Sequence, residues 1–542
     1  MGSAWSSPRR PPAATTDVPE HRTKIGRKFH EFGTLDDSIP PNKRVCHNVQ
    51  QPMQEGTYEN LSRVYVGATS VLATLAAWSP LQLFRRKNTD RISGLPDDIL
   101  LKILKLVTVR EAAMTSCLSK SWRHLWENVD DLILDIYTFG MQVPANSDDN
   151  DENLDFWNSE ATKFVNKANQ LLHQHSGNGV KRLKVRYPLN SIHASEIDRW
   201  VEFAVASRAE IISFFLDIHR ATRHIDPYTF PLNLFVAGVI SQDLRMLNLC
   251  NCMMEAAPAN LNGFACLESL SLNYVRLTDD DVQSIISSCH ALHHLYLKRC
   301  HELMNPRISH SQLVSLEVCR CWRLMSIRIY AENLRRFTYM GHLVDIEYEC
   351  APFLCELNAF FVSADECPLD CIVALPPLQR LSLQFASRFQ ISRLLQYSET
   401  FANLKEVTLC ILTSWKKSIR FVAYLFKAAT LVETLALEVT SNLRPPNELK
   451  IRWPRNFAPT RLSAVRIGGF SGESELVQFV FFLLRGSPVL KTLLIDTHPK
   501  NYQGLGKWKR DVAEDARSDY GRQVAMTRLA PNIPSTVNFG VI

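Results

Sequence analysis

The chain has 542 residues, a length that predicts more than one domain and a large buried core. Apolar residues make up 46% of it and charged residues 21%, the values of an ordinary globular protein. The net charge is +6, and residues 1–89 supply +5 of it with 12 basic and 7 acidic side chains. The rest of the chain is therefore nearly neutral, which argues against a nucleic-acid-binding surface.

Residues 1–89 form a lead-in without a clear periodic pattern. Residues 1–60 are rich in Pro, Ser, Thr and charge, and we expect them to be disordered. Residues 64–84 carry no charge and are long enough for a membrane-spanning helix, but Gly67, Ser79 and Pro80 keep the run only modestly apolar. Three interpretations of 64–84 stay open: a spanning helix, a loosely packed lead-in, or extra sequence from a mistaken gene model. We favour a lead-in that makes no membrane contact.

Residues 90–135 carry two apolar stripes at helical spacing. The first stripe consists of Leu95, Ile99, Leu100, Ile103, Leu104 and Val107, and the second of Leu118, Trp122, Leu125 and Trp126. Pro96 stands where the first helix should begin, and two aspartates follow it at the positive end of the helix dipole. About 40 residues cannot bury this much apolar surface alone, so we expect a neighbour or a partner protein to cover it.

This stretch resembles an F-box in three blocks of sequence. The matching residues are Leu95-Pro96-Asp97-Asp98-Ile99-Leu100, Ile103-Leu104 and Leu118-Ser119-Lys120-Ser121-Trp122-Arg123. The resemblance implies a three-helix unit that docks on a Skp-type adaptor and thereby joins a cullin–RING ubiquitin ligase. It assigns the adaptor contact to Leu95, Pro96, Ile99, Leu100, Ile103, Leu104, Leu118 and Trp122, with Trp122 anchoring the third helix. The alternative, a helix-turn-helix DNA reader, would need an exposed basic helix that this segment lacks.

Residues 136–179 connect the F-box-like segment to the rest of the chain. Residues 146–155 hold five acidic side chains, so we expect a solvated loop there. Residues 156–175 then predict a helix whose apolar side includes Phe156, Phe164 and Leu171.

A repeated pattern, Leu-x-x-Leu-x-Leu with conservative replacements, dominates the remaining chain. Copies begin at Leu244, Leu267, Leu292, Leu313, Leu334, Leu354, Leu378, Leu404, Val432, Leu462 and Leu490. The steps between starts are 20 to 26 residues up to Leu404, as in leucine-rich repeats, and 28 to 30 residues afterwards. Two irregular earlier copies are Val180-Leu183-Val185 and Ile211-Phe214-Leu216.

Positions 4 and 6 of each copy should point into the core of a short strand, and position 1 should fill the turn before it. Each unit leaves an apolar edge that only the next unit covers, so 180–456 should fold as a curved solenoid. The predicted fold class is therefore α/β, with an N-terminal three-helix F-box followed by this solenoid.

The 14 cysteines are scattered, and no secretory signal precedes them, so we expect reduced thiols in the cytoplasm or nucleus. Cys252, Cys300 and Cys321 all fall at position 9 of their repeats, where this repeat class takes Asn or Cys to close the turn. Cys250 with Cys252, and Cys319 with Cys321, look like metal-ligand pairs, but their spacing is not that of a zinc site. We favour buried turn positions over zinc binding and expect no metal.

Residues 457–496 resemble the FBD region that ends many plant F-box/LRR proteins, in the stretches 462–472, 475–479 and 482–493. The expected order of strand, glycine turn, amphipathic helix, loop and strand would continue the solenoid. Residues 197–201 and 230–235 resemble the same family, so the resemblance covers about 90–500. Residues 497–542 should close the stack as a cap or tail.

The sequence contains no phosphate-binding loop, nucleophile-elbow or metalloprotease motif. We therefore expect a non-catalytic receptor subunit of an SCF-type ubiquitin ligase, without a cofactor, whose repeats bind an unidentified target protein. The alternative is a protein-binding scaffold that takes no part in ubiquitin transfer. A third possibility, a small-molecule co-receptor, rests on Arg299, Arg320 and Arg323, which occupy near-equivalent repeat positions.

Overall fold

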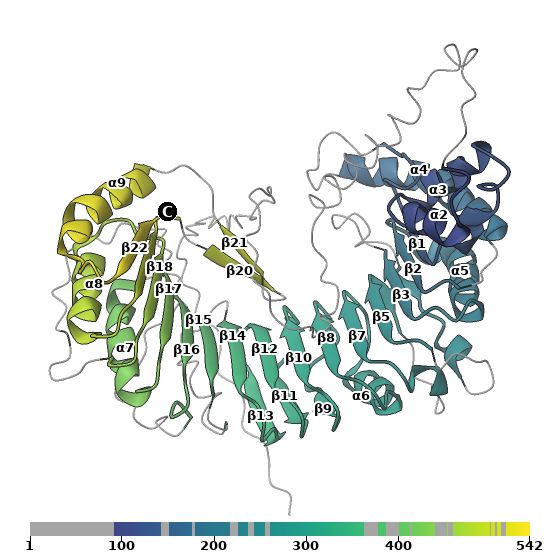
Figure 1. The fold of residues 1–542 in the computed structure, drawn as a ribbon. Coiled ribbons are helices and arrows are strands. Elements are labelled where there is room, and N and C mark those ends of the chain that lie inside the picture. The colour runs from purple at the N-terminus through teal and green to yellow at the C-terminus, as the bar shows by residue number, and fades with distance from the viewer. Residues whose placement is uncertain are drawn as a thin grey trace, which may run out of the picture.

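The computed structural model of the chain is an arc of parallel strands with helices along its outer side (Figure 1). The structure describes residues 92–142, 151–175, 179–216, 226–236, 243–254, 261–361, 378–385, 400–411, 415–439, 459–498, 500–504, 507–510 and 516–542, with the single residues 375 and 453. The lead-in 1–89, with its apolar run 64–84, lies outside these residues. None of the helices within them is both long and apolar enough to cross a membrane.

Within these ranges, fifteen strands form one sheet in which every neighbouring pair is parallel. They are β1 (Asp131–Asp135), β2 (Arg182–Arg186), β3 (Ile211–Phe215), β5 (Met246–Cys250), β7 (Ser269–Asn273), β8 (His294–Lys298), β10 (Ser315–Cys319), β12 (Arg336–Gly341), β14 (Glu356–Phe361), β15 (Arg380–Phe385), β16 (Glu406–Ile411), β17 (Thr434–Val439), β18 (Ala464–Gly468), β19 (Thr492–Asp496) and β22 (Asn538–Val541). This arrangement confirms the predicted α/β solenoid.

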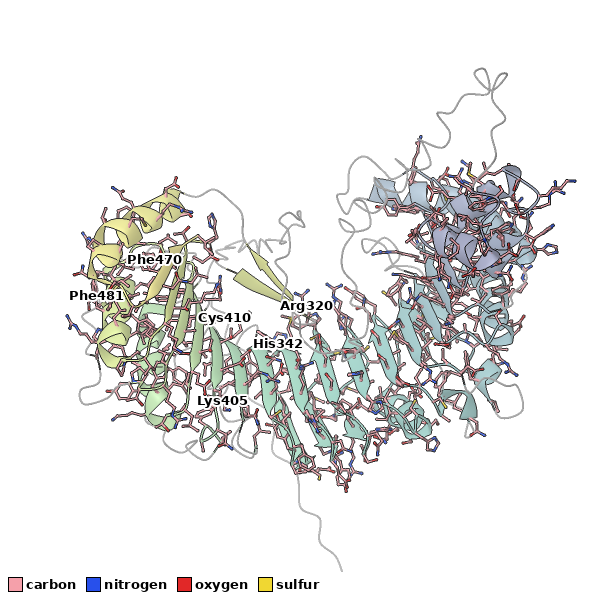
Figure 2. The ribbon with its side chains drawn as sticks, viewed as in Figure 1. Arg320, His342, Lys405, Cys410, Phe470 and Phe481 are labelled. Carbon is pink, nitrogen blue, oxygen red and sulfur yellow. The ribbon has the colours of Figure 1, made fainter. Side chains whose placement is uncertain are left out.

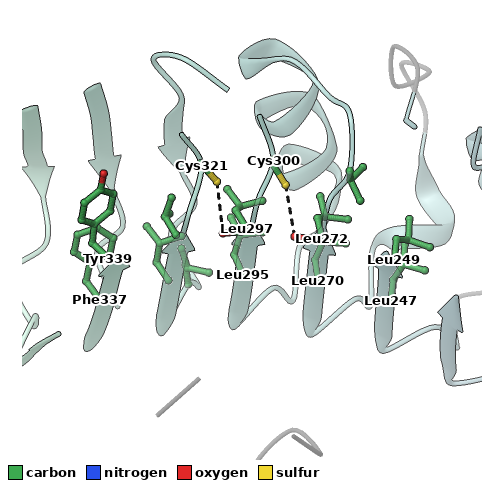
Figure 3. Close-up of a cluster of buried hydrophobic side chains, with 14 of the residues drawn as sticks. Leu247, Leu249, Leu270, Leu272, Leu295, Leu297, Cys300, Cys321, Phe337 and Tyr339 are labelled. Atoms are coloured by element: carbon green, nitrogen blue, oxygen red, sulfur yellow. Dashed lines mark hydrogen bonds between the residues drawn. The ribbon is translucent and has the colours of Figure 1, made fainter. Parts of the chain in front are cut away.

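The inward positions of the repeats form continuous rows through the core (Figure 3). The strand register pairs Leu247 with Leu270 and Leu270 with Leu295, and the same row continues into Leu316 and Phe337. Each of these side chains is at most 1% exposed. Each apolar layer is covered by the layers of its two neighbours, as expected for a stack of repeats.

One of the two irregular repeats is shifted by two residues from its prediction. The strand register pairs Ile212 with Leu247 and Phe214 with Leu249, so the second irregular repeat is Ala209-Ile212-Phe214 rather than Ile211-Phe214-Leu216. The apolar run continues past the inward positions, and Leu216 is also buried, which made both alignments fit the pattern. The register of the neighbouring strands removes that ambiguity.

The first strand of the solenoid belongs to the F-box-like segment itself. Strand β1 pairs with β2 so that Leu132 faces Leu183 and Leu134 faces Val185. Beyond β1, helix α4 (Asp151–Gln174) begins before the predicted Phe156, in what was predicted to be the acidic loop. His175, directly after α4, contacts the carbonyl of Val129 through Nε2 at 3.1 Å and packs edge-on against Trp126. The segment is therefore joined to the solenoid by backbone and core contacts.

Repeat length decides which element returns along the outer side of the arc. The steps from Leu292 to Leu354 are 21, 21 and 20 residues, and each holds a short strand: β9 (Arg307–Ser309), β11 (Ser326–Tyr330) and β13 (Asp345–Cys350). These strands form a second parallel sheet. A strand spans about twice the length per residue of a helix, so the short repeats complete their return with extended chain.

Longer repeats carry helices on the same outer side (Figure 1). These helices are α5 (Ala194–Ala206), α6 (Asp279–Ser288), α7 (Trp415–Ala428) and α8 (Ser474–Gly486). Helix α6 begins with a capping box in which Thr278 and Asp281 each bind the other's backbone N–H. Helix α8 buries Leu476, Phe479 and Leu483, as the amphipathic prediction for this region required.

Cys300 and Cys321 lie in the buried turns that follow their strands, as predicted, whereas Cys252 is buried but begins the short strand β6 (Cys252–Met253). The thiol of Cys300 contacts the carbonyl of Leu272 at 3.6 Å, and that of Cys321 contacts the carbonyl of Leu297 at 3.9 Å (Figure 3). A thiol donating to a carbonyl of the preceding repeat takes the place of an amide in closing the turn. Across the part of the chain that the structure describes, no three His, Cys, Asp or Glu side chains are grouped to hold a metal ion.

The C-terminal residues end the arc with a helix and a last strand. Helix α9 (Ala516–Val524) precedes β22, which pairs with β19. Between β19 and α9, strands β20 (Lys500–Gly504) and β21 (Lys507–Arg510) form an antiparallel hairpin that lies inside the arc (Figure 1).

The fold predicts that acid will loosen the middle of the solenoid through His310. Its Nε2–H donates to the carbonyl of Cys289 at 2.5 Å, while its buried Nδ1 has no hydrogen-bond partner among the residues that the structure describes. Burial lowers the pKa of His310 below the ordinary 6.5, and the nearby His290 and His293 lower it further. The unfolded chain therefore binds more protons than the folded one as pH falls below 6.5, so stability is lost there.

We expect the midpoint of thermal unfolding, followed by circular dichroism, to fall between pH 7.5 and 5.5, and to fall less in His310→Gln. His173 is exposed in the last turn of α4, so His173→Gln provides the matched surface variant. An identical pH dependence in wild type and His310→Gln would contradict the prediction.

Candidate adaptor-binding surface

The F-box-like segment is built from two short helices, a set of turns and strand β1. Helix α2 (Asp97–Leu104) starts directly after Pro96, whose carbonyl accepts hydrogen bonds from the N–H groups of Ile99 and Leu100. Helix α3 (Val109–Met114) starts at Thr108, which forms a capping box with Glu111. These start signals fix where each helix begins and hence which side chains face the core.

The third element is shorter than the helix predicted from the second stripe. Residues 118–124 form turns, and a 3₁₀ helix, η3 (Leu125–Asn128), follows them. Ser93 donates to the hydroxyl of Ser119 at 3.0 Å, and Ser119 shares a hydrogen bond of 2.8 Å with Ser121. Serine hydroxyls that bond locally compete with helix formation, which explains the turns.

The same serines attach these turns to the beginning of α2. The indole N–H of Trp122 donates to the hydroxyl of Ser93 at 3.1 Å, and Trp122 is buried. Ser93 lies two residues before Leu95, and Ser119 directly follows Leu118. The apolar side chains of Leu95 and Leu118 therefore belong to the same part of the surface, although 23 positions separate them in sequence.

The eight residues assigned to the adaptor contact divide into two groups by exposure. Leu100, Leu104 and Trp122 are at most 4% exposed, and they support the segment from inside. Leu95, Ile103 and Leu118 are 37%, 38% and 62% exposed. Pro96 is also exposed, and Ile99 is half-buried. Only this second group presents apolar atoms that a partner protein can touch in this conformation.

Three further exposed apolar residues were absent from the predicted contact. They are Ile92, Leu106 and Met114, and Leu106 is 69% exposed. Helix α2 ends at Leu104, so Leu106 follows in a turn rather than on the helical face that the stripe suggested. The exposure of Leu106 was not predicted because the sequence did not show where the helix ends. A helix continued to Val107 would place Leu106 away from the apolar side.

Much of the apolar surface that residues 90–135 could not bury by themselves is buried in the core of this chain. Trp126 and Val129 are buried in the same cluster as the first repeats, and Ala112 of α3 is fully buried there. The predicted surplus therefore has two destinations, the chain's own solenoid and the exposed side chains around α2. The second is the candidate adaptor-binding surface, which we define as Ile92, Leu95, Pro96, Ile99, Ile103, Leu106, Met114 and Leu118.

One group of side chains near the C-terminus has the composition of a catalytic triad. His498 Nε2 lies 3.3 Å from the hydroxyl of Ser518, but His498 Nδ1 is 3.9 Å from Asp496, too far for a hydrogen bond. Asp496 binds Arg466 at 2.7 Å, and Ser518 donates to Thr497 at 2.7 Å. Each polar group is occupied in holding α9 and the last strand to β19, so the group is structural.

Two family models match this chain. The F-box domain matches residues 92–134, and the At1g61320/AtMIF1 LRR domain matches residues 171–542. Neither is an enzymatic domain. The second match covers both the repeats and the region that resembles an FBD.

Several curated proteins of Arabidopsis thaliana are similar to the chain. F-box/LRR-repeat protein At3g03360 is 26% identical over 300 residues, which cover 55% of this chain and 56% of that protein. F-box/FBD/LRR-repeat protein At3g52680 is 26% identical over 433 residues, covering 78% and 76%. F-box protein At5g03100 is 28% identical over 262 residues, covering 47% and 73%. The chain thus spans little more than half the length of the first of these relatives.

Among solved structures, a leucine-rich-repeat protein of Leptospira interrogans, LIC12759, matches 59% of this chain and 84% of its own. Its sequence identity is 13% and its TM-score 0.25, so no conclusion is drawn from this likeness.

The exposure pattern predicts effects of very different size for two leucines that lie two positions apart. Leu104→Ala should lower the free energy of unfolding by about 2–5 kcal/mol, because it leaves a cavity in the core. Leu106→Ala should change it by less than about 0.5 kcal/mol, because that side chain is mostly in water. Urea unfolding followed by tryptophan fluorescence, to which the buried Trp122 and Trp126 contribute, measures both changes, and equal effects would refute the division.

Proposed function

This chain belongs to the plant F-box/LRR family that carries the At1g61320/AtMIF1 LRR domain, and from that premise we propose that it is the substrate-recognition subunit of an SCF-type ubiquitin ligase. The F-box binds a Skp-type adaptor, and the solenoid binds the target protein. The chain itself is not catalytic, since the chemistry of ubiquitin transfer lies with the other subunits. Its gain is one of effective concentration, because the target and the ubiquitin carrier are held on one frame.

The observation that carries the proposal is the exposure of Leu95, Ile103 and Leu118 beside a fully packed core. Burying a large apolar side chain is worth about 1.5–3 kcal/mol, and these side chains keep much of that surface in water. They lie on the segment that matches the F-box domain and not on the repeats. An adaptor that covers them would gain this free energy without disturbing the solenoid.

The location that fits this function is the cytoplasm or the nucleus. The cysteines that the structure describes are all free thiols, and many of them are buried in the repeat turns. A reducing compartment keeps such thiols free. Fluorescent tagging of the full chain with compartment markers tests the location, and a secreted product would contradict it.

Adaptor binding is tested by placing charge on the candidate surface. Ile103→Glu and Leu118→Glu should each reduce co-purification with the Skp-type adaptor at least about tenfold, because each buries a carboxylate in an apolar contact. Leu95→Ala with Pro96→Ala should abolish it. Phe353→Glu is the matched control, since Phe353 is exposed to the same degree as Leu118 but lies on the repeats. Unchanged binding in the F-box variants with folded repeats would count against the assignment.

A second measurement separates a ligase subunit from a scaffold. Proteins that co-purify with the tagged chain are identified by mass spectrometry, and their abundance is compared with and without the gene. A target of a ligase should accumulate when the gene is removed and should carry ubiquitin when the complex is reconstituted. Bound proteins whose abundance and ubiquitination never change would favour the scaffold.

A further inference from the structure

The outer sheet of β9, β11 and β13 has two edges, and the protein treats them differently. At the β9 edge, the side-chain amide of Gln283 on α6 donates to the carbonyl of Ser309 at 3.3 Å and accepts from its N–H at 3.1 Å. A carboxamide that bonds both backbone groups of one residue takes the place of a further strand. Helix α6 therefore closes this edge, and it lies beside β9 in Figure 1.

At the other edge, β13 is the last strand of the sheet among the residues that the structure describes. The N–H of Asp345 donates to the carbonyl of Met325 at 3.3 Å, so Asp345 directs its backbone groups toward β11. Successive residues of a strand direct their N–H and C=O to opposite sides, so those of Ile346 point away from β11. An edge of this kind is a template for one more strand.

The apolar side of β13 is less well covered than the same side of its neighbours. The register places Ile308 beside Ile329 and Ile329 beside Tyr348, and it places Ile327 beside Ile346. Ile308, Ile327 and Ile329 are 0% exposed, whereas Ile346 and Tyr348 stay partly exposed. A layer of a stack is buried by the layers on both of its sides, so an added strand would complete the cover of Ile346.

The solvent side of the outer sheet carries more acidic than basic side chains. Asp345, Glu347 and Glu349 alternate along β13 and are all exposed. Arg307 of β9 binds Glu349 at 2.6 Å, and Arg328 of β11 lies opposite Glu347 in the register. Two cations therefore face three carboxylates, and within the described ranges neither Asp345 nor Glu347 forms an ion pair. The surplus negative charge lies next to the β13 edge.

The sequence around β13 extends this negative charge. Residues 337–379 contain seven acidic residues and no Lys or Arg. This count includes residues 362–374, which lie outside the described ranges and hold three acidic residues and no basic one. The segment is therefore strongly negative, in a chain whose net charge is +6.

Three basic side chains from the same half of the arc belong to the inner sheet. Figure 2 shows Arg320, His342 and Lys405 beside the inner strands. Arg320 directly follows β10, His342 directly follows β12, and Lys405 directly precedes β16. None of the three is a residue of the outer sheet, whose charges are those of β9, β11 and β13.

We propose that an extended, basic segment of the target protein binds the β13 edge as a fourth strand of the outer sheet. Its backbone bonds the N–H and C=O of Ile346, its apolar side chains pack beside Ile346, and its Lys or Arg side chains face Asp345 and Glu347. The two-residue period of a strand allows both sets of contacts at once. The inference deepens the proposed function, on which it rests, by naming the chemistry of the bound segment.

The charges of β13 also decide between a target and a second copy of this chain. Two β13 strands paired edge to edge would bring Asp345, Glu347 and Glu349 of one copy close to the same carboxylates of the other. Like charges opposite one another in a sheet are destabilising, and charged edges prevent such pairing. A strand that carries Lys or Arg gains attraction where a second copy meets repulsion. Charge complementarity therefore selects a basic occupant.

The test uses the full chain and short fluorescent peptides. In the first peptide Lys alternates with Val, and in the second Glu alternates with Val. The third has the composition of the first but groups its Lys residues at one end. We expect the first to bind at least about tenfold more tightly than either of the others, measured by fluorescence anisotropy, because it alone combines positive charge with the two-residue period. On binding, amide hydrogen exchange should slow across residues 345–350.

Two substitutions at one position separate the backbone from the side chain. Ile346→Pro removes the N–H that points to the edge, so it should weaken binding of the alternating Lys peptide at least about tenfold. Proline is tolerated where the N–H of an edge strand points away from the sheet. Ile346→Ala is the matched control, because it keeps the N–H and should weaken binding much less. The unfolding temperature of each variant shows whether the repeats stay folded.

A charge-reversed variant tests the choice of occupant and leaves the backbone as it is. Asp345→Lys with Glu347→Lys should reverse the preference, so that the alternating Glu peptide binds more tightly than the alternating Lys peptide. Asp280→Lys is the control, since Asp280 is an exposed acid on α6, beyond the closed edge of the same sheet. It should leave the preference unchanged.

Three results would overturn the site: equal binding of the grouped or the Glu peptide, the same loss in Ile346→Ala as in Ile346→Pro, or an unchanged preference in the charge-reversed variant. A chain that binds none of the peptides would also overturn it and would show that the carboxylates serve to keep the edge unpaired. Failure of this site is distinguishable from failure of the proposed function. The Ile346 variants should retain the adaptor, and Ile103→Glu with Leu118→Glu should lose the adaptor but retain the peptide.

Discussion

The structure depends on one constraint, which is that each apolar layer of the solenoid is covered only by the layers beside it. The row through Leu247, Leu270 and Leu295 shows this most simply, because every member is buried by its two neighbours and by the return segment of its own repeat. Such a stack needs an end. At the C-terminal side, β22 and α9 provide it, and at the N-terminal side the F-box does so through β1.

This constraint also explains how the F-box divides its apolar residues. Leu100, Leu104 and Trp122 face inward and fold the domain, while Leu95, Ile103 and Leu118 stay exposed. The sequence alone shows two apolar stripes that each mix the two groups, because exposed and buried residues obey the same helical spacing. What separates them is the end of α2 and the hydrogen bonds among Ser93, Ser119 and Trp122, and neither is visible in a pattern of apolar residues.

The repeats were predictable because a strand inside a parallel stack has a strict inward position, such as Leu295 or Leu316. Where the apolar run continued past that position, as at Leu216, the pattern fitted two registers and only the neighbouring strand decided between them. The outer sheet of β9, β11 and β13 escaped prediction because its signal is the short repeat length rather than an apolar pattern. The positive φ angles of Arg299 and Arg320 were also not predicted, because arginine in a sequence gives no sign of a left-handed backbone.

Strand β1 fixes the orientation of the F-box relative to the repeats, which matters for the ligase that we propose. It is the last part of the F-box and the first strand of the sheet, so the two parts are joined by backbone pairing rather than by a separate linker. In the complex that we propose, the angle between the adaptor and the arc would be set by the pairing of Leu132 with Leu183 and by the packing of Trp126 against His175. Under that proposal, a fixed orientation between the two parts would decide which lysines of a bound target come within reach of the ubiquitin carrier.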